Sequence, residues 1–161
     1  MNAQLATLST DRSAPMIAAT RLRRGDRASS SGAVRMIRDS ITLARRVGAS
    51  GPILVRADSA YCSAAIVAAT TKAGAQYSIG IGMNPHVRRA IAAINEKAWT
   101  RIHCPQAIPD PYTGELVSAA EIAETDYTAF TSKPTRHQVR TRLIVRRIPE
   151  LNTNKLANQD P

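Results

Sequence analysis

The stretch ILVRADSAY, residues 53–61, decides the fold class of this chain. Its first three residues (53–55) are apolar without alternation, which is typical of a strand covered on both faces of a sheet. The acidic residue Asp58 follows where that strand ends. We expect a helix next, over about residues 60–73, because Gly74 stops the apolar pattern there.

The residues that follow repeat this order of a strand and then a helix. Residues 77–83 are predicted to form another strand, and Pro85 opens a third helix that reaches about Ile94. Two strands that alternate with helices indicate a parallel α/β unit.

The residues before this unit predict a hairpin and a helix. Residues 4–8 and 15–22 read as two antiparallel strands joined by a turn over residues 9–14. A helix is expected to start at the serines of residues 29–31, which offer N-terminal caps, and to run to about Val47.

The chain changes character after Trp99, where prolines break it into short segments. Strands are predicted over residues 99–103, 125–130 and 143–148. We therefore expect a partial α/β core over residues 1–98 and a β-rich insertion over residues 99–148. The tail, residues 149–161, has no core pattern and is predicted to be disordered.

The charge balance favours a nucleic-acid partner. Lys and Arg number 22 against 12 acidic residues, a formal net charge of +10. Most of the basic residues are Arg, whose planar fork suits phosphate. An anionic membrane is less favoured, because no basic amphipathic helix with a bulky apolar face is predicted. No secretory signal or membrane span is predicted either, and the two cysteines form no CxxC pattern, so we expect a reduced, cytoplasmic chain.

Two interpretations of Asp58 stay open from the residues alone. A carboxylate at the carboxyl end of a central parallel strand lies where α/β folds place their sites. An Asp followed by Ser before a helix is also the ordinary pattern of a helix cap. The two roles are compatible, because an Asp at this point can lie beside the cap.

The string Arg56-Ala57-Asp58-Ser59-Ala60-Tyr61 resembles the RxDSGF-type motif of DDE transposases in insertion-sequence family thirteen-eighty. Further segments resemble the family in the same order and together span about residues 3–153: residues 19–25, 83–87, 98–100, 127–132 and 142–147. The resemblance implies a partial ribonuclease H-like fold, a mixed sheet with flanking helices interrupted by the β-rich insertion. It also implies DNA cleavage and strand transfer with Mg²⁺ held by three acidic residues.

Only one of these three acids maps onto the chain. Asp58 matches the second, and the resemblance makes it a catalytic and metal-binding residue. The first acid is expected before the hairpin and the third beyond the insertion. Other acids do not replace them, since they fall in the hairpin turn, near the first helix or in the insertion: Asp11, Asp26, Asp39, Glu121 and Glu124. We therefore expect an internal fragment that cuts no DNA alone and leaves residues 53–55 and 77–83 without part of their cover.

Basic side chains are the candidates for DNA contact. The main group lies in the insertion: Lys133, Arg136, Arg140, Arg142, Arg146 and Arg147. The alternative is an ordinary charged hairpin. Arg56, two residues before Asp58 in the motif, and the arginines at positions 21, 23 and 24 are weaker candidates. The histidines show no metal-ligand spacing, and no phosphate-binding loop is present.

Three functions follow, in order of preference. The first is a DDE transposase fragment whose DNA partner is the transposon end with its terminal inverted repeats, associated with the nucleoid. The second is a non-catalytic remnant that binds DNA or an intact transposase, with a homo-oligomer as a further partner. The third is an unrelated small α/β protein, which would unfold cooperatively as an isolated chain.

Overall fold

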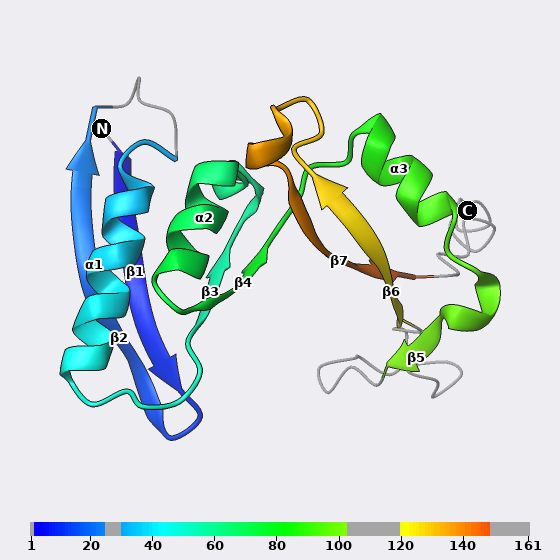
Figure 1. Ribbon diagram of the computed structural model, residues 1–161. Coiled ribbons are helices and arrows are strands. Elements are labelled where there is room, and N and C mark those ends of the chain that lie inside the picture. The colour runs from blue at the N-terminus through cyan, green and yellow to red at the C-terminus, as the bar shows by residue number, and fades with distance from the viewer. Residues whose placement is uncertain (1, 25–29, 103–119, 149–161) are drawn as a thin grey trace, which may run out of the picture. The chain divides into compact units, whose positions relative to one another are not determined.

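The computed structural model describes residues 2–24, 30–102 and 120–148 (Figure 1). The chain divides into two compact units. The first contains Met1–Gly82 with Phe130–Gln138, and the second contains Met83–Ala129 with Val139–Pro161. The tail that is predicted to be disordered, residues 149–161, lies outside the described residues. So does Asp26, one of the acids considered above.

The first unit opens with the predicted hairpin. Strand β1 spans Asn2–Thr10 and strand β2 spans Ser13–Arg23, paired antiparallel from Asn2↔Arg23 to Thr10↔Ser13. The strands are longer than predicted, and the turn is correspondingly short. Two register shifts, between Ala6 and Thr7 and between Leu8 and Thr10, interrupt the ladder.

Helix α1 spans Ala33–Arg46, and its start corrects the prediction that a serine caps it. The N-cap is Gly32 with φ 80°, and no side chain caps the helix. Glycine suits this position because the left-handed conformation disfavours a side chain. The guanidinium of Arg21 also lies against the place where a Cβ would be. Gly32 therefore suits the start of the helix for two reasons, its left-handed backbone and the lack of room for a side chain beside Arg21.

The predicted order of strand, helix and strand is confirmed, although the helix and the second strand are shorter than predicted. Strand β3 spans Leu54–Ala57, helix α2 spans Ala64–Lys72, and strand β4 spans Gln76–Ile79. The two strands pair in parallel from Leu54↔Gln76 to Ala57↔Ile79. The expectation that β3 is covered on both faces is wrong, because the side chain of Leu54 is 53% exposed.

Helices α1 and α2 lie side by side over one face of the strands, and the core of the unit is there (Figure 1). Its buried side chains come mainly from the helices, and include Ile41, Ala44, Ile66 and Val67. The α/β class is confirmed. The single mixed sheet expected for a ribonuclease H-like fold does not form within the described residues, where β1 pairs with β2 and β3 pairs with β4.

The second unit contains a helix and an antiparallel sheet. Helix α3 spans Pro85–Ala92, and the side chain of Asn84 caps it by accepting from the backbone N–H groups of His86 and Val87. Strands β5 (Thr100–Ile102), β6 (Ala120–Ala129) and β7 (Val139–Arg147) pair in that order. The predicted helix at Pro85 and the β-rich segment are confirmed.

The core of the second unit is small. Val87 of α3 is 2% exposed, and the buried side chains of the sheet are Ala120, Ala123, Tyr127, Ala129 and Leu143. The ring of His86 lies 5.2 Å from that of Tyr127, centroid to centroid, and its Nε2 is 3.3 Å from the carbonyl oxygen of Thr128. Helix α3 thus belongs to the same compact unit as the strands after it. The domain boundary at residue 98 stays a prediction.

Candidate functional site

Asp58 lies at the carboxyl end of β3, as the sequence predicts. Its Oδ1 accepts a hydrogen bond from the backbone N–H of Ala60 at 2.8 Å, so it caps the short 3-10 turn Ser59–Tyr61. Within the described residues, its second carboxylate oxygen has no hydrogen-bond partner. The side chain is exposed. The cap and a free oxygen therefore coexist, as the two interpretations from the sequence allow.

Gly80 holds the loop that carries Asp58. It follows β4, and its backbone N–H donates to the carbonyl of Ala57 at 2.9 Å. A Cβ at this position would lie 3.1 Å from the backbone N of Ser59 and 3.5 Å from the carbonyl carbon of Asp58. Only a residue without a side chain fits there without a shift of the loop. Sequence reasoning missed this role, although a glycine inside the predicted strand, residues 77–83, was the available signal.

Arg56 is an exposed residue of β3, and Asp58 follows it two residues later, after the strand has ended. Side chains of a strand alternate between its faces, so Arg56 shares a face with Leu54 and not with Val55. No ion pair joins Arg56 to Asp58 in the described part of the chain. The Asp58 carboxylate therefore keeps its charge available for another partner.

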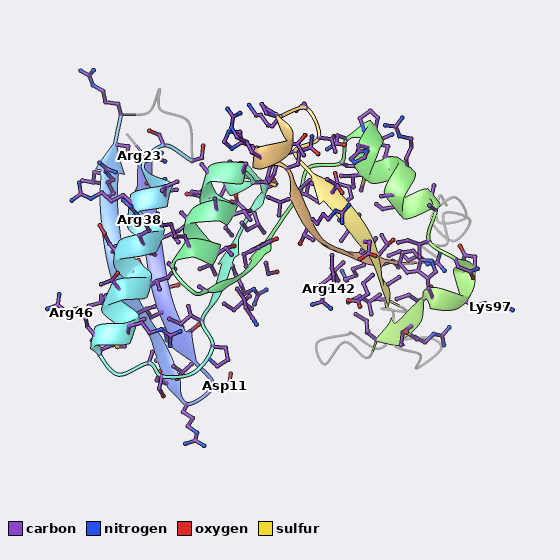
Figure 2. The ribbon with its side chains drawn as sticks, viewed as in Figure 1. Asp11, Arg23, Arg38, Arg46, Lys97 and Arg142 are labelled. Atoms are coloured by element: carbon purple, nitrogen blue, oxygen red, sulfur yellow. The ribbon has the colours of Figure 1, made fainter. Side chains whose placement is uncertain are left out.

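Among the described residues, the other acids considered above lie on elements other than the loop that carries Asp58. Asp11 lies in the hairpin turn between β1 and β2 (Figure 2). The carboxylate of Asp39 is 3.4 Å from Arg35 on the exposed side of α1. Glu121 and Glu124 belong to β6 in the second unit, where each is paired with an arginine.

The described residues therefore offer only part of the ligands that the Mg²⁺ implied by the resemblance would need. The described ranges contain no group of three or more His, Cys, Asp or Glu residues that could hold a metal ion. Asp58 offers one carboxylate, whereas a protein-bound Mg²⁺ in a two-ion site needs several oxygen ligands. The residues present do not fit the complete site.

The predicted basic residues of β7 fall on two faces of the sheet. Arg140, Arg142 and Arg146 are exposed, in alternation with the less exposed Thr141, Leu143 and Val145. Figure 2 shows the side chain of Arg142 extending from β7, where its Nη1 is 2.8 Å from Glu124 Oε2. The exposed face therefore carries three arginines and a partly compensating acid.

Arg147 ends β7 on the opposite face and is held by its own unit. Its Nη2 and Nη1 lie 2.6 and 3.0 Å from the two carboxylate oxygens of Glu96, and its Nε is 2.8 Å from Glu121. Its Cζ lies 3.9 Å from the centroid of the Trp99 ring. The hydrogen bond from Arg147 lowers the pKa of Glu96. The hydrogen bond to Glu96 raises the already high pKa of Arg147.

Lys133 and Arg136 lie in the turn between β6 and β7 and are exposed. The turn is shaped locally: Gln138 Nε2 donates to the carbonyl of Lys133 at 2.9 Å, and Arg136 Nε donates to His137 Nε2 at 3.1 Å. Phe130 enters the turn with φ 61°, an unusual value for a residue with a side chain. This shape leaves the Lys133 ammonium at the surface.

Helix α1 carries further arginines. Arg38 and Arg46 are exposed and extend from the helix in Figure 2. Arg45 instead donates to the carbonyls of Ala49 and Gly51 at 2.7 and 2.6 Å and closes the end of the helix.

Within the described residues, no helix has the length and apolar character that a membrane crossing requires.

A comparison with protein families matches the model described as transposase DDE domain group 1, over residues 11–154. The match includes β2, both parallel strands, Asp58 and β7. No curated protein and no solved structure matches the chain. A match over most of the chain shows its family, and with it a relation to DNA transposition. The chain belongs to the family of transposase DDE domains, group 1.

Proposed function

We propose that this chain contributes Asp58 as one of the metal-binding carboxylates of an insertion-sequence transposase of family thirteen-eighty. By itself, the chain binds DNA without cutting it. The observation that carries the proposal is the position of Asp58 at the carboxyl end of β3 with one carboxylate oxygen uncommitted. That end of a parallel strand pair is where α/β folds bind their ligands.

Asp58 supplies one hard oxygen ligand, which is the kind that Mg²⁺ selects. Its Oδ1 stays anchored to Ala60, so the loop fixes the direction of the carboxylate before a metal arrives. Gly80 supports this geometry from the neighbouring strand. One carboxylate holds a divalent ion only weakly, so the remaining ligands come from the rest of an intact transposase.

The DNA contacts are assigned to the exposed face of β7, with Arg140, Arg142 and Arg146, and to Lys133, Arg136 and Arg56. Guanidinium groups bind phosphate oxygens through paired hydrogen bonds. Such contacts hold the DNA backbone without reading its sequence. Arg147 has a different role, because its donors are engaged by Glu96 and Glu121. The partner is the transposon end with its terminal inverted repeats, in the nucleoid.

Paramagnetic Mn²⁺ tests the metal role of Asp58. In NMR spectra of the full chain, millimolar Mn²⁺ is expected to broaden the amide signals of residues 57–61 and of Gly80. The substitution Asp58→Asn should remove this broadening because the amide carries no charge. Gly80→Ala should change it, whereas Gly82→Ala should not, since a Cβ at Gly82 meets nothing within 4 Å. Equal broadening in the chain and in Asp58→Asn would overturn the assignment.

Salt-dependent DNA binding tests the basic face. The triple variant Arg140→Gln, Arg142→Gln, Arg146→Gln should lower the slope of log K against log salt by about 0.9 for each phosphate that the protein no longer neutralises. The matched control removes the same charge elsewhere, with Arg12→Gln, Arg38→Gln and Arg46→Gln. An equal decrease in both variants would show that only net charge matters. Mg²⁺-dependent nicking of plasmid by the chain alone would refute its inactivity.

A non-catalytic DNA-binding remnant is the second candidate function. The formal net charge of +10 favours it independently of Asp58. It predicts the same salt dependence, but no effect of Asp58→Asn on Mn²⁺ broadening. The combination of the two experiments therefore separates the candidates.

A further inference from the structure

Three arginines gather at the end of β2, next to the start of α1. Arg21 and Arg23 belong to β2, and Arg24 follows the strand directly. The register pairs Arg21 with Gln4, and cross-strand partners share a face of the sheet. Gln4 is 1% exposed on the face that α1 covers (Figure 1). Arg21, and Arg23 two residues later, therefore reach from β2 toward α1.

The side chains of Arg21 and Arg23 meet the turn that leads into α1. The guanidinium of Arg21 lies against Gly32, where a Cβ would otherwise be. Nη1 of Arg23 donates to the carbonyl oxygen of Ser31 at 3.5 Å. Ser31 and Gly32 directly precede Ala33, the first residue of the helix. Two guanidinium groups from one strand therefore converge on one turn.

This turn holds positive charge without a nearby acid to balance it. The start of an α-helix carries a partial positive charge, because its first N–H groups point outward from that end. No acidic residue lies in the first turn of α1, and no side chain caps the helix. Among the residues that the structure describes, Arg21 and Arg24 take part in no ion pair. A bound anion offsets the repulsion between like charges, so the turn favours an anionic ligand.

The arginines lie at the same end of the first unit as Asp58. Strands β2 and β3 run in the same direction (Figure 1), and Arg23 and Asp58 come at or just after their carboxyl ends. Figure 2 shows Arg23 at the opposite end of the hairpin from Asp11. Ala33, at the start of α1, and Tyr61, three residues after Asp58, line one cavity of about 230 Å³. The start of α1 therefore lies near the loop that carries Asp58.

We propose that Arg21, Arg23 and Arg24 form a phosphate-binding cluster that holds the DNA backbone beside the loop of Asp58. Guanidinium forks bind the oxygens of a phosphodiester through paired hydrogen bonds. In the described residues no ion pair joins the cluster to the Asp58 carboxylate, so its arginines are positioning residues. Such contacts fix where a DNA strand lies and read no sequence. The inference rests on the proposed function for the identity of the ligand, and it adds a second contact to that of β7.

Two glycine variants test the cluster without changing the charge of the chain. Gly32→Ala places a Cβ where the Arg21 guanidinium lies and forces that group away. Gly48→Ala is the control, because Gly48 also has a positive φ, 99°, but a Cβ there meets nothing within 4 Å. Both variants strain the backbone, and only Gly32→Ala displaces an arginine.

The probe is a short fluorescein-labelled DNA duplex, whose anisotropy is followed as the full chain is added. Gly32→Ala should weaken binding by about tenfold, which corresponds to the loss of one charge-assisted contact. Gly48→Ala should change binding by less than about twofold. Circular dichroism verifies that both variants fold. Equal weakening by both variants would trace the effect to backbone strain and would overturn the proposal.

A charge variant gives a second measurement that involves no backbone strain. Arg21→Gln with Arg24→Gln should lower the slope of log K against log salt by about 0.9 for each phosphate contact that is lost. The matched control, Arg12→Gln with Arg46→Gln, removes the same charge from exposed positions of the same unit and should leave the slope nearly unchanged. Equal slopes for the two variants would overturn the proposal.

Inorganic phosphate is the second probe, because a free anion could occupy the same turn. At matched ionic strength it should displace the DNA only weakly, since a DNA backbone makes several contacts at once. Complete displacement of the duplex by inorganic phosphate would assign the cluster to a free anion and overturn the proposal.

The same titrations separate this inference from the proposed function. Weaker binding by the triple variant of β7, with no effect of Gly32→Ala, would overturn the cluster alone. Weaker binding by Gly32→Ala, with no effect of the triple variant, would support the cluster and refute the DNA contacts assigned to β7. The effect of Gly32→Ala should persist in Asp58→Asn, because the cluster binds phosphate without a metal. Its disappearance in that background would overturn the proposal.

Discussion

The guanidinium of Arg147 stacks on the indole of Trp99, with 3.9 Å between its Cζ and the ring centroid. The same guanidinium binds both oxygens of Glu96 and one of Glu121. The cluster thus joins the end of β7, the strand β6 and the segment before β5. Because Trp99 is the only tryptophan of the chain, its fluorescence reports directly on this cluster.

We expect Arg147→Lys to lower the thermal midpoint of the Trp99 fluorescence transition by a few degrees. Lysine keeps the charge but cannot bind Glu96 with two parallel hydrogen bonds or stack its head group flat on the indole. Arg142→Lys is the control, since Arg142 makes one exposed pair with Glu124. Equal midpoints for both variants would show that the fork geometry contributes nothing.

Stability should depend on pH through Glu96. Its pKa is lowered in the folded chain, chiefly by the hydrogen bond from Arg147. The contribution is therefore complete above the unfolded pKa of a glutamate and is lost as the pH falls through the lower, folded value. Urea unfolding followed by Trp99 fluorescence should show a gap between the chain and Glu96→Gln that is constant above about pH 5 and shrinks below about pH 4. A gap that widens on acidification would contradict this.

Replacement of Thr70 by valine should stabilise the first unit. Thr70 is 0% exposed, and its Oγ1 has no hydrogen-bond partner within the described residues. Valine has nearly the same shape and removes the cost of a buried, unpaired hydroxyl, so urea unfolding followed by circular dichroism should show a gain of about 1 kcal/mol. Thr71→Val, at the exposed neighbouring position, should change stability by less than about 0.5 kcal/mol. A loss of stability in Thr70→Val would reveal a partner for the hydroxyl.

Cys62 should react slowly with thiol reagents. Burial raises the pKa of its thiol, so a smaller fraction is thiolate at a given pH. In a Cys104→Ser variant, which isolates Cys62, the rate of reaction with a disulfide reagent should rise with pH at a midpoint above that of the unfolded chain. Identical pH profiles before and after unfolding in guanidinium would contradict the role of burial.

Local patterns explain which elements the sequence predicts correctly. Asn84 and Pro85 mark the start of α3 because a cap and a fixed φ both act within one turn. The hairpin of β1 and β2 follows from two short runs beside a turn. The position of Asp58 after β3 depends on the same kind of local signal, the end of an apolar run.

Contacts between distant residues explain what the sequence does not predict. Arg147 meets Glu96, 51 residues away, so a count of basic residues groups it with the exposed arginines of β7 although it is held on the other face. Gly80, directly after the neighbouring strand β4, lies close to Ser59, and no local pattern identifies that partner. The serines before α1 fit the rule for a cap, but Arg21, from β2, and the left-handed Gly32 decide the start.

The alternation along β7 has a genetic consequence. Even-numbered positions such as Arg140 and Arg146 point to solvent, and odd-numbered ones such as Leu143 and Arg147 point to the unit's interior. Loss of one codon within the strand would exchange the two sets beyond the deletion, burying guanidinium groups and exposing leucine. Loss of two codons would restore the assignment of each remaining side chain. Among natural variants, we therefore expect insertions or deletions of an even number of residues in β7 to be tolerated and those of an odd number to be selected against.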